Sequence, residues 1–202
     1  MRVTFRFLPV VLALVISAAG CGAPPTADID GARASVAKAV TDGAGQYAAD
    51  AIKAAQDALA ALDAALARLT PAQCLQPGAS GEMSVKDMLA HITWHELQMI
   101  GVIEQMALVG SPWWELPTDE RNAHIYAANR DRAWEDVLAE AQQVYPRLLA
   151  ALQTLDETAF LDASRFRDMP PDWEPWQVLA DNTFDHYDHH LADLMKSELG
   201  GY

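Results

Sequence analysis

Residues 84–109 read SVKDMLAHITWHELQMIGVIEQMALV, and their pattern decides the fold class. Mostly apolar side chains recur at spacings of three and four residues, which is the repeat of an amphipathic helix. This stripe consists of Val85, Met88, Ile92, His95, Met99, Val102, Met106 and Val109. Ser84 and Asp87 resemble a capping box at the start of the helix, with Asp in place of the usual Glu. A Gly-Ser-Pro sequence at 110–112 is expected to end it.

Three other segments carry the same helical repeat. They are residues 52–69, 134–155 and 176–199. Shorter helices are expected over residues 30–42 and 119–129, and no segment has the alternating pattern of a convincing strand. The sequence therefore predicts an all-α protein. Its four amphipathic helices would bury their stripes as an up-and-down four-helix bundle over residues 46–202.

The composition fits a single acidic domain. The chain has 202 residues, of which 51% are hydrophobic, so it can form one substantial core. It contains 28 acidic and 14 basic residues, which gives a formal net charge of −14. Such a surface repels phosphate backbones and no basic stripe offsets it, so nucleic acid is excluded as a partner.

The first 20 residues have the order of a secretory signal peptide: a basic start, an apolar run, and then small residues before Cys21. Ala-Ala-Gly-Cys also resembles a bacterial lipoprotein signal, although Ala18 stands where a larger aliphatic residue is usual. We predict an exported protein that is lipid-anchored at Cys21 to the cell membrane or envelope and faces the extracytoplasmic side. Residues 21–45 would form a tether and a short helix. The alternatives are an ordinary signal peptide and a disulfide between Cys21 and Cys74.

Three histidines are candidate metal ligands. His186 and His190 are four residues apart and share one face of a helix, where they could chelate a single cation. His91, on another helix, would be the third ligand. Three imidazoles leave a fourth position open for water or substrate, which is typical of a catalytic metal site. The alternative is a set of core imidazoles that are satisfied by hydrogen bonds, because burying an unpartnered polar group costs about 1–3 kcal/mol.

His95 and Glu96 are candidate proton carriers. His95 lies on the buried stripe, one turn after His91, and could be a fourth ligand, a proton shuttle or a core histidine. The pair lacks the second His of a His-Glu-x-x-His helix, so zincin chemistry is excluded. No Glu stands three residues before any His, which argues against a ferritin-like di-iron bundle.

The sequence also suggests positions and roles for other polar and aromatic residues. Asp87 and Asn182 lie four residues before His91 and His186, where each could orient a ring, although helix capping is the favoured role of Asp87. The remaining histidines are expected to be solvated. The loop tryptophans are expected either to wall a pocket or to plug the ends of the bundle. These residues are His124, His189, Trp113, Trp114, Trp173 and Trp176.

The motifs over residues 84–92 and 182–190, in this order and at this separation, resemble the DinB superfamily and specifically its ClbS/DfsB branch. The likeness covers about residues 46–199. It implies a four-helix bundle in which one His of the second helix and a His-x-x-x-His pair of the last helix bind a divalent metal, commonly zinc or nickel. In this chain those ligands would be His91, His186 and His190.

Metal-bearing relatives implied by this resemblance include thiol-dependent transferases and isomerases, and a hydrolase that opens an electrophilic cyclopropane in a genotoxin. Many ClbS-like members lack the second His of the pair, which is present here as His190. Two features depart from the family pattern. His95 stands where Trp is usual, and the lipoprotein-like leader is atypical of a mostly cytosolic family.

The leading hypothesis is a metal-dependent enzyme in which the metal activates water or a thiol to attack an electrophilic small molecule. Cytosolic thiol cofactors are scarce outside the membrane, which favours hydrolysis. The first alternative is a lipid-anchored bundle that binds a metal or a hydrophobic ligand without turnover. The second is a purely structural bundle. Assembly into a homodimer stays open.

Overall fold

The computed structural model describes residues 47–199. The expected leader, Cys21, the tether and the helix over 30–42 lie outside these residues. Most of the described chain is helical, as predicted. Within this range, no helix combines the length and apolar character needed to cross a bilayer.

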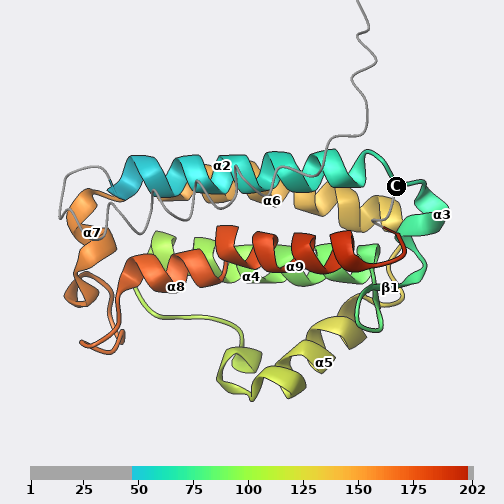
Figure 1. The fold of residues 1–202 in the computed structure, drawn as a ribbon. Coiled ribbons are helices and arrows are strands. Elements are labelled where there is room, and N and C mark those ends of the chain that lie inside the picture. Colours follow the sequence, from blue (N-terminus) through green and yellow to red (C-terminus); the bar gives the residue numbers. More distant parts are fainter. Residues whose placement is uncertain (1–46, 200–202) are drawn as a thin grey trace, which may run out of the picture.

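Long helices lie side by side along the molecule, and of the shorter elements some close its ends and others lie along its length (Figure 1). The long helices are α2 (Tyr47–Leu66), α4 (Val85–Gln105), α6 (Trp134–Leu152) and α9 (Phe184–Lys196). Helix α2 packs on α6 and α9, and α4 packs on the same two helices. The shorter elements are α3 (Pro71–Cys74), β1 (Pro77–Ser80), β2 (Met83–Ser84), η1 (Pro112–Glu115), α5 (Thr118–Asn129), α7 (Glu157–Leu161), η2 (Ala163–Arg165) and α8 (Pro175–Asp181).

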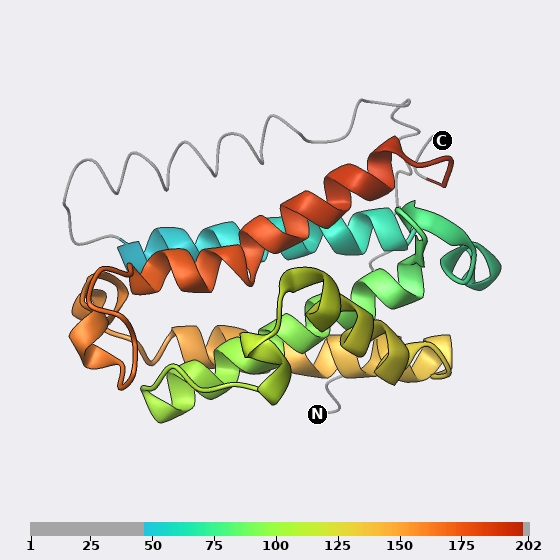
Figure 2. The same ribbon diagram turned by 90° about the horizontal axis from the view of Figure 1, so that it is seen from below.

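Helices α4 and α6 run in the same direction, because α5 carries the chain back along the molecule between them (Figure 2). The first half of α4 shares a buried cluster with the first half of α6, including Met88 and Val137. The second halves share another cluster, including Met99 and Leu148. This order of directions differs from the alternating up-and-down order that the sequence predicts. Helical stripes identify buried faces, but they do not determine which way a helix runs.

Helix α4 begins where predicted and ends earlier. The Ser84 hydroxyl accepts a hydrogen bond from the Asp87 amide at 3.2 Å, and the Asp87 carboxylate accepts one from the Ser84 amide at 3.1 Å, which confirms the capping box. Met106 has a φ of 44°, in the left-handed region, and ends the helix before the expected stop at 110–112. The chain then pairs with Arg167, whose backbone bonds to those of Met106 and Leu108 at 2.9 and 2.8 Å.

The last predicted helix, over residues 176–199, is in fact two helices, α8 and α9. The break falls at Asn182 and Thr183, and Thr183 has the non-helical angles φ −132° and ψ −103°. The Asn182 amide donates to the Val178 carbonyl at 2.8 Å, and the Thr183 hydroxyl donates to the Leu179 carbonyl at 2.6 Å. Side chains that bond to nearby carbonyls in this way compete with the helical backbone.

A small antiparallel hairpin of β1 and β2 precedes α4, where no strand was predicted. Its strands are too short to show an alternating pattern. Gly78 and Gly81 have φ values of 106° and 59°, which favour glycine. The Ser80 hydroxyl donates to the Asp193 carboxylate at 2.6 Å and ties the hairpin to α9.

Candidate metal centre

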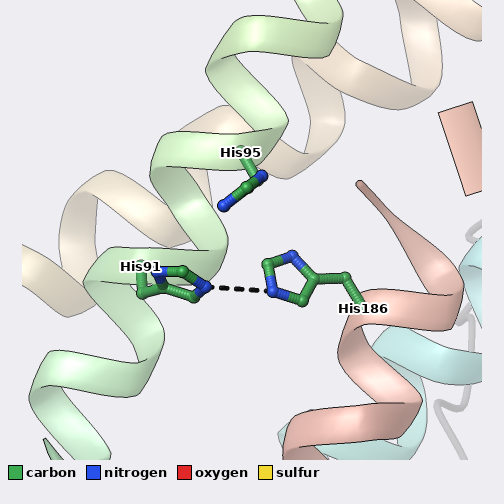
Figure 3. Close-up of side chains that lie close together, drawn as sticks. All are labelled: His91, His95 and His186. Carbon is green, nitrogen blue, oxygen red and sulfur yellow. Dashed lines mark hydrogen bonds between the residues drawn. The ribbon is translucent and has the colours of Figure 1, made fainter. Parts of the chain in front are cut away.

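The structure brings together the three histidines that the sequence singled out as ligands. His91 projects from α4 and His186 from the first turns of α9, and their Nε2 atoms lie 3.0 Å apart (Figure 3). The Nε2 atoms of His186 and His190 are also 3.0 Å apart. The i, i+4 spacing on α9 and the packing of α9 on α4 produce this convergence.

His95 belongs to the same cluster. One ring nitrogen from each of His91, His95 and His186 lies within 4.8 Å of the others, so these three could also hold a metal ion. The His95 ring centroid is 4.4 Å from that of His186. Four imidazoles are therefore available, and His190 adjoins the group through His186.

Asn182 orients His95. Its Oδ1 lies 2.8 Å from His95 Nδ1, and its amide nitrogen donates to the Val178 carbonyl, which fixes the direction of the amide group. Because Oδ1 can only accept, His95 carries its proton on Nδ1 and keeps a lone pair on Nε2. The sequence suggested that Asn182 could orient a ring, with His186 four residues later; the structure confirms the role and shows that the ring is that of His95. The break between α8 and α9 turns the side chain toward α4 instead.

Burial keeps the imidazoles neutral. His91, His95 and His190 are each 5–6% exposed. Burial, with smaller effects from neighbouring charges, lowers the pKa of His91 to about 3 and the pKa values of His95 and His190 to about 4. Burial also lowers the pKa of His186 strongly. At neutral pH the rings are therefore in the form that binds a metal.

The protons of the cluster do not balance without a further partner. His186 Nε2 carries either one proton or one lone pair, yet it faces two other Nε2 atoms. The Nδ1 atoms of His186 and His190 are buried and have no hydrogen-bond partner among the described residues. A cation would accept a lone pair from each ring. Tetrahedral Zn²⁺ holds its nitrogen ligands roughly 3.3 Å apart, close to the observed separations. The donor set therefore fits a divalent metal.

Glu96 points from α4 into a different cavity from the histidines. Its carboxyl accepts a hydrogen bond from the Tyr187 hydroxyl and lines a separate cavity of about 190 Å³ with Tyr145 and apolar side chains. Glu96 does not line the histidine cleft, so the expectation that it carries protons there has no support from its position. Burial raises its pKa to about 8.

Glu96→Gln is expected to remove a pH-dependent loss of stability. Between pH 4.5 and about 8 the folded protein binds more protons at Glu96 than the unfolded chain does, so the free energy of unfolding falls as pH rises. From pH 7 to 8 this carboxyl should lower stability by about 1 kcal/mol, and the buried histidines, which bind fewer protons in the folded protein than in the unfolded chain, offset part of this loss. Urea unfolding of the metal-free protein measures the change. Glu104→Gln, at an exposed position of α4, should keep the slope of the wild type. Parallel stability profiles of the wild type and Glu96→Gln would contradict the prediction.

The histidines open onto a cleft of about 710 Å³. Its other walls come from α5 with the segment before it, and from α8 with the loop before it. The lining includes Trp114, Thr118, Arg121, Asn122, Asp172, Trp173, Glu174, Asp181 and His189. Two of the loop tryptophans therefore wall this pocket. His124 and His189 are exposed, as expected, although the His124 ring stacks on Trp113 with centroids 5.4 Å apart.

Fold and site together define a helical protein with a candidate polyhistidine metal centre at the base of a cleft. The family model of the DinB superfamily matches residues 26–194, so the chain belongs to this superfamily. Searches of curated proteins and of solved structures found no match.

Proposed function

We propose that this protein is a metal-dependent enzyme of the ClbS/DfsB type within the DinB superfamily. The metal, zinc or nickel, would activate water or a thiol to attack an electrophilic small molecule. The observation that carries the proposal is the convergence of neutral imidazole nitrogens at the base of a cleft large enough for such a substrate. The packing of α2, α4, α6 and α9 on one another supports the four-helix bundle expected of this family.

The proposed ligands are His91, His186 and His190. A metal of this kind lowers the pKa of bound water to about 7 and so supplies hydroxide at neutral pH. His95 is the proposed proton acceptor, because Asn182 holds its Nδ1 proton and leaves Nε2 free to take another. The alternative, His95 as a ligand, is supported by its place among the three closest nitrogen atoms.

Export remains part of the proposal. The leader-like sequence and Cys21 support a lipid anchor on the extracytoplasmic side of the membrane. In that compartment water is the more available nucleophile, so we favour hydrolysis over thiol transfer. Thus the function proposed is that of an envelope hydrolase acting on an electrophile.

Elemental analysis of the purified protein tests the metal. Wild-type protein is expected to contain about one divalent ion per chain, and the variant His186→Ala plus His190→Ala almost none, since three-ligand sites lose most of their affinity when two ligands are removed. His124→Ala, at an exposed position of α5, should retain the ion. An unchanged metal content in the double variant would overturn the metal site.

The single variant His95→Ala separates the two roles considered for His95. If His95 is the proton acceptor, His95→Ala should keep the metal and lose turnover of epoxide or cyclopropane probes. If it is a ligand, the metal content should fall as well. A metal-loaded wild type that turns over no electrophile would favour the second candidate, a lipid-anchored binding bundle.

A further inference from the structure

Arg121 stands out among the residues that line the histidine cleft. It is the single Lys or Arg in the described lining, and no carboxylate of residues 47–199 lies within ion-pair distance of it. The protein has twice as many acidic as basic residues, and yet none of these carboxylates in the described range pairs with Arg121. Its charge is available to a ligand.

The guanidinium of Arg121 is held in place by neutral groups. It donates to the Trp114 carbonyl at 3.3 Å and to the Thr118 hydroxyl at 3.5 Å, and it lies 5.8 Å from the Trp114 ring centroid. Its Nε is buried and has no hydrogen-bond partner among the described residues. These contacts orient the guanidinium without neutralising it, which suits recognition of a planar anion.

Arg121 lies close enough to the histidines for one small molecule to reach both. All of them line the same cleft. Burial is the main cause of the low pKa of His95, and the charge of Arg121 contributes to it, so the guanidinium is within electrostatic range of the cluster. A ligand bound at Arg121 would therefore extend toward the candidate metal.

Acidic groups elsewhere in the cleft limit the charge of the ligand. Asp172, Glu174 and Asp181 line it from α8 and the loop before it. Glu174 accepts a hydrogen bond from the Trp176 indole at 2.8 Å. Three carboxylates in the same cleft would repel a polyanion such as a diphosphate, whereas a single carboxylate held by Arg121 is compatible with them.

We infer that the cleft takes a monocarboxylate and that Arg121 binds its carboxylate group. The electrophilic part of the same molecule would then lie against the histidines. This orientation rests on the proposed function, but carboxylate binding at Arg121 does not. Arg121 is therefore a specificity-determining residue, and the substrate class is a small organic acid with an electrophilic centre.

Binding of benzoate and benzamide to the metal-free protein tests this inference. The two probes have similar shape and differ in charge, and the absence of metal prevents the carboxylate from binding an ion instead. The indole N–H signal of Trp114 in NMR titrations reports binding in the cleft. Benzoate is expected to bind the wild type more tightly than benzamide. Arg121→Gln should weaken benzoate binding about 10- to 100-fold and leave benzamide binding unchanged.

Controls keep this test independent of folding and of the metal. Arg167→Gln, at an exposed position outside the cleft, should bind benzoate like the wild type. Arg121→Lys should retain part of the affinity, because it keeps the charge and loses the bidentate geometry. Equal binding of the two probes by wild type, or unchanged benzoate binding in Arg121→Gln, would overturn the inference, as would tighter binding of pyrophosphate. Metal content reports on the proposed function separately and should be unchanged in Arg121→Gln.

Discussion

Zinc at a thousand times its dissociation constant is expected to raise the free energy of unfolding of this protein by about 4 kcal/mol. The reason is that the ring nitrogens of His91, His186 and His190 already converge in the folded state and are neutral, whereas the unfolded chain does not hold them together. Urea unfolding of the metal-free protein at pH 7.5, with and without zinc, measures the gain.

Matched variants show whether this gain comes from the cluster. In His91→Ala most of the stabilisation by zinc should disappear, because α4 no longer supplies its proposed ligand to the histidines of α9. In His124→Ala it should persist in full, since His124 is exposed and lies on α5. Equal stabilisation of the two variants would show that zinc binds elsewhere.

Lys86→Met should lower the free energy of unfolding by about 3 kcal/mol, because removing one member of a buried charged network leaves its partners unsatisfied. Lys86 is 6% exposed, and its ammonium group donates to the backbone carbonyls of Asn129, Arg130 and Arg132. It thereby connects the start of α4 to the turn between α5 and α6. Methionine has a similar length and preserves the packing of the aliphatic stem.

Lys53→Met is the control for this substitution. The Lys53 side chain is 70% exposed and pairs with Asp57 on the same helix, a type of interaction that contributes only about 0.3–0.5 kcal/mol. Urea midpoints of the two variants should therefore differ clearly. If both variants were equally stable, the contacts of Lys86 with the three carbonyls would not contribute to the fold.

The sequence predicted those parts of the fold that depend on local chemistry. Ser84 and Asp87 define the start of α4 through hydrogen bonds between residues three apart, and the buried stripes follow from helical periodicity. The direction of α6 and the break at Asn182 were not predicted. They depend on the path of α5 and on side-chain hydrogen bonds that compete with the backbone, and neither has a periodic signal.

The sequence likewise predicted only the part of the candidate site that depends on local spacing. The spacing of His186 and His190 already places them on one face, and His91 flanks a stripe that faces α9. Neighbours on a helix point about 100° apart, which explains why His95 faces the cleft and Glu96 the other cavity. The role of Arg121 had no local signal, since it depends on where α5 lies.

The break between α8 and α9 has an electrostatic consequence. Helix α9 begins at Phe184, so His186 lies in its first turn, where the positive end of a helix dipole is located. In an uninterrupted helix from Pro175 onward, the same ring would lie several turns from that end. The partial positive charge disfavours an imidazolium at His186 and favours an anion beside it. An interruption of two residues thus places the start of a helix, with its partial positive charge, beside the cluster.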